Sequence, residues 1–179
     1  AADHGRDHLL TEVAGMNSTD CTRFLRCSLA VLGLWLVGCD RAQLSGPPTL
    51  RLGRDECAAC GMIIDEERCS SALLVERNGL REHLAFDDIG CIAHYLAAAA
   101  SLPRGAVVYV ADHRTKAWVR ADRATYTRVP GLATPMGSHI VAHESAASRD
   151  QDVDLRDGMP VGMEELFGAA APGRGGPRP

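Results

Sequence analysis

The stretch SALLVERNGLREHLAF, residues 71–86, decides the fold of this 179-residue chain. Its two halves are rich in apolar residues, and they flank the dipeptide Asn78-Gly79. Both residues of the dipeptide tolerate a positive φ, so Asn-Gly between two strand-like runs is a strong signal of a β-hairpin. The sequence therefore predicts two antiparallel strands, over residues 68–76 and 80–86.

The segment DDIGCIAHYLAAAA, residues 87–100, follows the hairpin directly and has the pattern of a helix. Asp87 or Asp88 can cap its N-terminus, and Pro103 ends it. Its apolar positions recur at helical spacing: Ile89, Ile92, Ala93 and Leu96. Residues 106–112, AVVYVAD, then have the β-branched alternation of a strand. This half of the domain is expected to run strand, strand, helix, strand.

A weaker copy of this order follows in the second half. KAWVRA (116–121) or ATYTRV (124–129) supplies a strand, and SHIVAHE (138–144) supplies the next one. A short polar segment and a helix in MEELF (163–167) complete the copy. We therefore predict an α+β fold of two small ββαβ-type units, with antiparallel-rich sheets and short helices.

The N-terminal region has the layout of a secretory signal peptide. Arg23 and Arg26 precede an apolar run over residues 27–39, which is too short to span a bilayer because a spanning helix needs ~20 apolar residues. Met16 is a plausible start for this signal. Residues 1–38 are thus predicted to be an upstream extension followed by a signal peptide.

The end of the apolar run, LVGC, resembles the lipobox of bacterial lipoproteins, in which the signal is cut before the cysteine, here Cys39, and that residue is acylated. The resemblance implies a periplasmic protein held on a membrane by lipid, and Asp40 implies retention on the inner membrane in some bacteria. We then expect a tether over residues 39–54, a folded domain over 55–167 and a disordered tail over 168–179.

Composition narrows the classes of partner. The net charge is -4 and only 4% of residues are aromatic, which argues against nucleic acid. The exported part keeps four further cysteines: Cys57, Cys60, Cys69 and Cys91. Because thiols tend to pair in an oxidising compartment, these cysteines require either disulfides or a metal as an explanation.

The sequence DECAACGMIID, residues 55–65, places Cys57, Cys60 and Met62 close together. A redox role needs a cysteine of low pKa, usually at a helix N-terminus, and no helix pattern follows Cys60. A structural zinc site needs four ligands, and only one CxxC is present. A Cys57–Cys60 disulfide is a further possibility. A Cu(I) site would use Cys57, Cys60 and Met62 together, because Cu(I) prefers thiolate and thioether sulfur.

A second methionine lies in TPMGSHIVAH, residues 134–143. The flanking proline and glycine predict an abrupt turn that holds the Met136 sulfur outward, as a candidate ligand. His139 is a candidate ligand beside it. His143 is expected on one face of a half-buried strand.

Other polar and sulfur side chains have simpler interpretations. Cys91 and His94 share a helix face and could be ligands, but a helical cysteine is more often a small buried hydrophobic residue. The same holds for Cys69, which is expected in a strand. Asp87 and Asp88 are interpreted as helix-capping residues.

Four elements together resemble the NosL family, the nitrous oxide reductase accessory lipoproteins. They are CAACGMII, HLAFDDIGCIAHYL, VYVADHRTKAWVRADRATY and TPMGSHIVAH, over about residues 55–145, with the lipobox at Cys39. Cys60 and Met62 match the family's CGM element, Cys57 the first cysteine of its CxxC form, and Met136 its PMG element. The resemblance implies two small ββαβ units, related to part of the organomercurial lyase fold.

The resemblance also implies a function. We expect an exported, lipid-anchored Cu(I)-binding protein, not an enzyme, which supplies copper to nitrous oxide reductase or its maturation machinery during denitrification. Two alternatives from other classes remain: a periplasmic thiol–disulfide oxidoreductase that uses the CxxC, and a structural zinc or disulfide module that docks a partner. A lyase is a remoter possibility.

Overall fold

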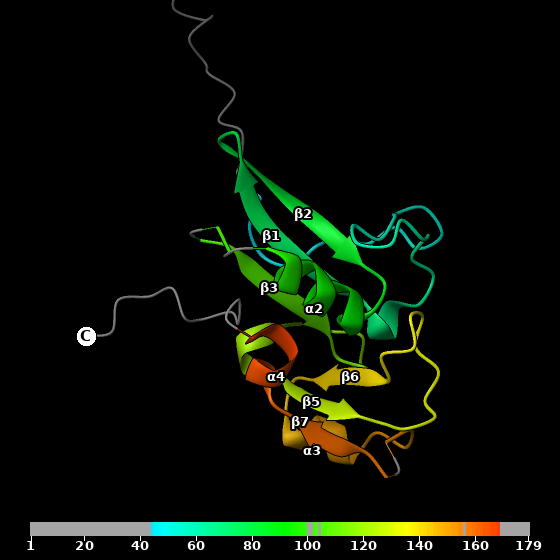
Figure 1. The fold of residues 1–179 in the computed structure, drawn as a ribbon. Helices are drawn as coiled ribbons and strands as arrows, with labels where there is room; N and C mark the ends of the chain where they lie inside the picture. Colours follow the sequence, from blue (N-terminus) through cyan, green and yellow to red (C-terminus); the bar gives the residue numbers. More distant parts are fainter. Residues whose placement is uncertain (1–43, 100–101, 104, 156, 169–179) are drawn as a thin grey trace, which may run out of the picture. The chain divides into compact units, whose positions relative to one another are not determined.

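The hairpin predicted around Asn78-Gly79 is present and forms one edge of a four-stranded antiparallel sheet (Figure 1). This computed structural model describes residues 44–99, 102–103, 105–155 and 157–168. Strand β1 (Ser71–Arg77) pairs with β2 (Leu80–Phe86) along their full lengths. Asn78 and Gly79 have φ values of 53° and 75°, so the turn uses the positive φ that its sequence favours.

The helix predicted after the hairpin is also present, as α2 (Ile89–Ala98). Asp88 is its cap, because its side chain accepts a hydrogen bond from Gly90 N at 2.6 Å. Strands β3 (Val107–Ala111) and β4 (Trp118–Arg120) complete the first sheet, whose order is β2-β1-β3-β4.

A second, three-stranded sheet has the order β6-β5-β7. Its strands are β5 (Thr125–Arg128), β6 (Ile140–His143) and β7 (Met159–Val161). Helix α3 (Ala146–Asp150) lies between β6 and β7, and α4 (Met163–Phe167) follows β7. The prediction of two ββαβ units is confirmed, since β5, β6, α3 and β7 repeat the order and pairing of β1, β2, α2 and β3.

Some local predictions need correction. Both candidate strands of the second half exist, one as β4 and the other as β5, with a 3-10 turn η4 (Ala121–Arg123) between them. Cys69 is not in a strand: it ends a 3-10 turn, η3 (Glu67–Cys69), which is capped by the Glu66 side chain. The helix of the second ββαβ unit is α3, in the short polar segment after SHIVAHE, and not the helix α4 in MEELF, which follows β7.

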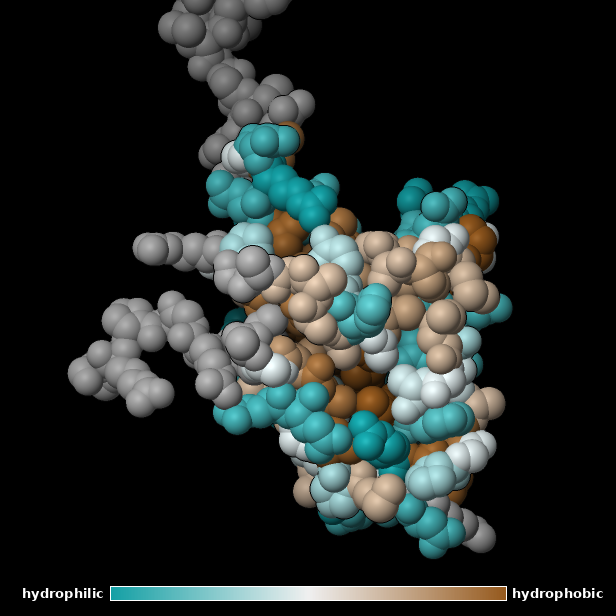
Figure 2. All heavy atoms as spheres, in the orientation of Figure 1, coloured by the Kyte–Doolittle hydropathy of each residue, from teal (hydrophilic) through white to brown (hydrophobic). Residues whose placement is uncertain are grey.

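One hydrophobic core joins the two sheets. It takes side chains from β1, β2, β3 and α2, and from β5, β6, β7 and α4: among them Leu73, Phe86, Ile92, Val110, Tyr126, Ala142, Val161 and Phe167. Figure 2 shows apolar side chains gathered where α2, α4 and β6 meet. The two units therefore form one packed domain.

The predicted signal peptide, with Cys39 and Asp40, and residues 169–179 of the predicted tail lie outside the described residues. The later part of the expected tether contacts the folded domain: His83 Nε2 of β2 lies 2.9 Å from Gly46 O, and Gly53 N donates to Ile64 O. Within the part of the chain that the structure describes, no helix has the length and apolar character needed to cross a bilayer.

Candidate metal centre

The CxxC sits in a tight loop that packs against the end of β2. Cys57 N donates to Met62 O and Gly61 N donates to Cys57 O, both at 2.8 Å, so the chain turns back on itself within five residues. Gly61 has a φ of 74°, which a side chain would disfavour. Ala58 N donates to Ala85 O, and this bond fixes the loop to the end of β2.

The N-terminus of α2 brings a third cysteine to this loop. The register of the hairpin pairs Ser71 with Phe86, so the residues before β1 and after β2 lie at the same end of the sheet. Cys91 is in the first turn of α2, where Cys91 N bonds to Asp88 O. The positive end of a helix favours negative charge, such as that of a thiolate.

Three thiols and one carboxylate converge at this place. One ligand atom from each of Cys57, Cys60, Cys91 and Asp87 lies within 4.8 Å of all the others. The Cys60 thiol donates to Asp87 Oδ2 at 3.6 Å. Cys57, Cys91 and Asp87 are buried, whereas Cys60 is exposed. The cluster therefore lies at the surface of the core and opens to solvent on the Cys60 side.

Burial raises the pKa of both buried thiols of the cluster. For Cys57 this rise is opposed by backbone N–H groups of Asp87, Cys60 and Ala59, which favour the thiolate. For Cys91, a hydrogen bond with Asp87 and the nearby Cys57 add to the effect of burial. These thiols are consequently protonated at neutral pH, and a metal ion would have to displace their protons.

Asp87 is the unusual member of the cluster. Its side chain is 2% exposed, and Asp87 Oδ1 has no hydrogen-bond partner among the described residues. A buried polar atom without a partner costs free energy, and such an atom in a folded protein calls for a specific explanation. Its position beside three thiols is consistent with a ligand site.

A cavity of about 390 Å³ adjoins the cluster. Its lining comes from the CxxC loop, the start of α2 and the loop before β6: Ala59, Cys60, Gly90, Cys91, His94, Met136 and Ser138. Met136 N donates to Asp88 Oδ2 at 3.0 Å, so the residue that caps α2 also holds the Met136 loop. The structure thus brings together Met136, Cys60 and Cys91, three sulfur side chains from three segments.

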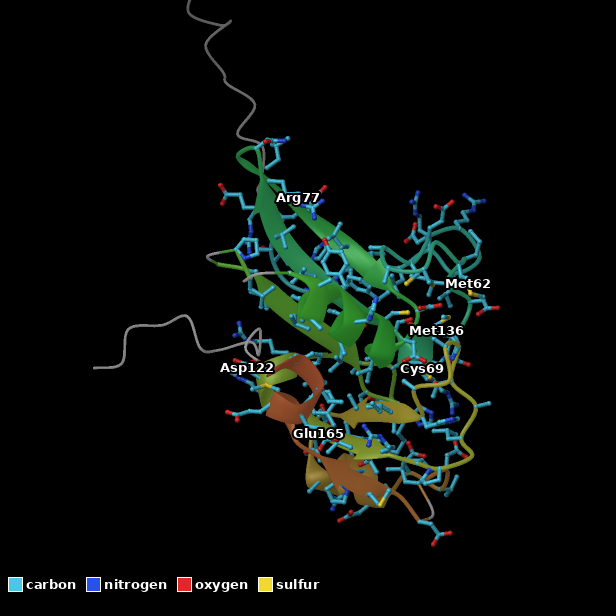
Figure 3. The ribbon with its side chains drawn as sticks, in the orientation of Figure 1. Met62, Cys69, Arg77, Asp122, Met136 and Glu165 are labelled. Atoms are coloured by element: carbon cyan, nitrogen blue, oxygen red, sulfur yellow. The ribbon has the colours of Figure 1, made fainter. Side chains whose placement is uncertain are left out.

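The other predicted ligands are placed differently. Met62 is 52% exposed and does not line the cavity; Figure 3 shows Met62 and Met136 on separate loops. His139 has a φ of 58°, and His139 Nδ1 lies 2.6 Å from Leu132 O. Neither His139 nor Met62 lines the cavity around Cys60 and Cys91.

Sequence reasoning missed Cys91 and Asp87 as members of the site. Cys91 was interpreted as a buried apolar residue and Asp87 as a helix cap, but Asp88 is the cap. The signal that could have identified them is the hairpin itself, because its register returns the chain to the CxxC end of the sheet.

The fold and this site define a class: a small α+β domain with a partly open cluster of thiols that can bind a metal. The NosL family model matches residues 50–166, and the chain belongs to the NosL family. Membership indicates a copper-binding accessory protein. No curated protein and no solved structure gave a match.

Proposed function

We propose that this protein is a Cu(I) carrier that binds the ion through Cys57, Cys60 and Cys91, with the Met136 thioether at the rim. The observation that carries the proposal is the cavity lined by Cys60, Cys91 and Met136 together. Cu(I) is the ion that takes thiolate and thioether sulfur, and it accepts two or three ligands. A thioether is not among the usual ligands of zinc.

Loading replaces thiol protons by the metal. The raised pKa of Cys57 and of Cys91 follows mainly from burial, so apparent Cu(I) affinity should increase with pH across the neutral range. The backbone N–H groups around the Cys57 sulfur favour the thiolate that remains after loading. They have the same role as the hydrogen bonds that orient metal ligands in other proteins.

Release uses the open side of the site. Cys60 is exposed and Met136 is 46% exposed, so a donor atom of an acceptor protein can reach the ion from the cavity. Copper then passes through intermediates in which both proteins supply sulfur, and the ion is never free. A carrier of this kind has no catalytic residue.

The location and the acceptor complete the proposal. Acylation of Cys39 would hold the protein on the periplasmic face of a membrane, with retention on the inner membrane if Asp40 acts as a sorting signal. NosL membership supports nitrous oxide reductase, or its maturation machinery, as the acceptor. The oxidoreductase alternative has less support, because burial raises the pKa of Cys57, the first cysteine of the CxxC, instead of activating it.

A competition titration tests the binding step. The reduced protein is titrated anaerobically with Cu(I) against a calibrated chelator, and separately with Zn(II). We expect one tightly bound Cu(I), weakened by Met136→Ala, and no effect of that change on Zn(II). Weak Cu(I) binding, or a Cu(I) affinity that Met136→Ala leaves unchanged, would contradict the proposal.

A second experiment tests delivery. The gene is deleted in its host and restored as wild type or as Cys57→Ser, and copper is measured in purified nitrous oxide reductase. We expect a copper-depleted enzyme with the variant. Full copper loading with the Cys57→Ser protein would refute the assignment of the acceptor.

A further inference from the structure

A second cluster of metal-binding side chains lies outside the thiol site, at the join between the two units. His113 Nδ1 lies 2.7 Å from Asp152 Oδ2, and His143 Nε2 lies 2.9 Å from the same oxygen. One ligand atom from each of the three residues lies within 4.8 Å of the others. Two imidazoles therefore converge on one carboxylate oxygen.

The cluster is buried, although all three of its members are polar. The side chains of His113, His143 and Asp152 are 6%, 0% and 4% exposed. Burial alone would raise the pKa of Asp152, but hydrogen bonds from His143 and His113 hold it below its ordinary value. Asp152 is consequently a buried anion at neutral pH.

Among the described residues, two buried side-chain polar atoms without a hydrogen-bond partner belong to this cluster or to the cavity beside it. Of the buried side-chain polar atoms described, three have no hydrogen-bond partner: Asp87 Oδ1, Thr127 Oγ1 and His143 Nδ1. Asp87 belongs to the thiol site. Thr127 lines the same cavity as Asp152, and His143 Nδ1 is the ring nitrogen that does not contact Asp152. Each buried polar group without a partner in a folded protein calls for a specific explanation.

The three side chains are held by a rigid frame. Asp112 Oδ2 accepts hydrogen bonds from Glu144 N at 2.9 Å and from Ser148 Oγ at 2.8 Å, and His113 N donates to Ala142 O. These bonds join the end of β3 to the end of β6 and to α3. Supporting hydrogen bonds of this kind fix the orientation of metal ligands.

We propose that His113, His143 and Asp152 form a second metal site, which takes a divalent cation of borderline hardness, Zn2+ or Cu2+. Two imidazoles and a carboxylate are a common ligand set for these ions, and Cu2+ is expected to bind more tightly than Zn2+. Metal–ligand bonds of ~2.0–2.2 Å put the ligand atoms of a tetrahedral site roughly 3.3 Å apart. The observed 2.7 and 2.9 Å contacts therefore need only a small outward movement.

The site has an entrance and room for a further ligand. A cavity of about 590 Å³ lies beside Asp152, and its lining includes Thr127, Arg149 and Gly158. Of the three residues, Asp152 lines this cavity, so water or a metal ion would approach the site from the Asp152 side. Because no thiol contributes, this site is distinct in its chemistry from the Cu(I) site, and its test does not depend on that proposal.

The test uses the protein with Cys57, Cys60 and Cys91 all changed to serine, since thiols would bind Zn2+ and reduce Cu2+. Zn2+ is titrated against a chromophoric chelator, and Cu2+ is followed by electron paramagnetic resonance. We expect one Zn2+ per chain and nitrogen couplings from two imidazoles on Cu2+. Asp152→Asn and His143→Gln should each weaken Zn2+ by more than about 100-fold, because even indirect changes to a metal site cost ~10–100-fold.

The matched control is His83→Gln, which removes a histidine of the first sheet and should leave Zn2+ affinity unchanged. Circular dichroism establishes that each variant is folded. If the triple-serine protein does not fold, Asp152→Asn and His143→Gln are compared in the native background, where each must remove one equivalent of bound Zn2+. Equal Zn2+ binding with and without these changes, or a Cu2+ spectrum without imidazole nitrogen, would overturn the proposal.

Discussion

In the first ββαβ unit, the connection between β2 and β3 contains a ten-residue helix, α2, whose first turn presents Cys91 to the CxxC loop. In the second unit, the connection between β6 and β7 contains a five-residue helix, α3, and a turn that presents Asp152 to His143. Both sheets have the same order around a central strand, β2-β1-β3 and β6-β5-β7. One topology therefore places side chains of the helix-containing connection at the end of a hairpin in both units, and the type of residue then decides the chemistry.

The largest expected effect is a loss of Cu(I) affinity that follows from a change in the thiol site and not from a change in the histidine cluster. Cys57→Ser should weaken Cu(I) by more than about 100-fold, because a thiolate ligand is replaced by a hydroxyl group, which is a poor ligand for this soft ion. His143→Gln, in the second unit, should leave Cu(I) affinity unchanged. Both are measured by chelator competition, and similar losses in the two variants would mean that the clusters are not separate sites.

The next effect concerns Asp112, whose hydrogen bonds join the end of β3 in the first unit to β6 and α3 in the second. Burial alone would raise the pKa of Asp112, but hydrogen bonds from Glu144 N, Thr115 N and the Ser148 hydroxyl lower it to about 2. A pKa that is lower in the folded state stabilises the fold above the ordinary value of about 3.9, here by about 2–3 kcal/mol. This contribution should disappear as the pH falls from about 4 to about 2.

Urea unfolding at several pH values checks this prediction. Asp112→Asn should lower the free energy of unfolding by about 2–3 kcal/mol at pH 7 and by much less near pH 2, where the wild-type carboxyl gains a proton. If the variant loses the same free energy of unfolding at both pH values, the charge of Asp112 is not what stabilises the contact between the units.

An alanine at Gly90 or at Gly158 would overpack its surroundings, so the two variants can be compared directly. A Cβ at Gly90 would lie 2.7 Å from Ser138 Cβ, and a Cβ at Gly158 would lie 2.5 Å from Thr127 Cγ2. Each alanine variant should be destabilised by about 1–3 kcal/mol. Only Gly90→Ala should also weaken Cu(I), because Ser138 shares the cavity with Met136. Weaker Cu(I) binding in Gly158→Ala as well would argue against a local site.

The smallest expected effect separates the two methionines. Met136→Ala should weaken Cu(I) roughly tenfold, which corresponds to about 1.4 kcal/mol, because Met136 lines the cavity beside Cys60 and Cys91. Met62→Ala should have less effect, since Met62 is exposed and outside that lining. The reverse order in a competition titration would place the copper on the outer side of the CxxC loop.

The sequence was sufficient for those elements whose signals are local. The Asn78-Gly79 turn, the cap at the start of α2 and the β-branched run of β3 each have a physical cause within a few residues. Strand β7 could not be predicted in this way: it is three residues long and contains Pro160, which fits only because β7 is an edge strand. Helix α3 is too short for a helical period to be visible.

The residues of the candidate sites differ in the same way: some have a local signal in the sequence, and others depend on contacts between distant segments. The CxxC and Met136 could be identified because their spacing and flanking turns are unusual by themselves. The contribution of Cys91 depends on the hairpin register, which pairs Ser71 with Phe86 and returns the chain to its starting end. The His113 cluster depends on a bridge between Asp112 and Ala142, which joins the two units and leaves no local pattern.

X-ray absorption at the copper edge tests the central claim most directly. The protein is loaded with one equivalent of Cu(I), and the nearest neighbours of the ion are counted in the wild type, in Cys91→Ser and in His139→Gln. The proposed site predicts sulfur neighbours only, at least three of them, fewer in Cys91→Ser and unchanged in His139→Gln. A nitrogen neighbour that disappears in His139→Gln, with no change in Cys91→Ser, would contradict it.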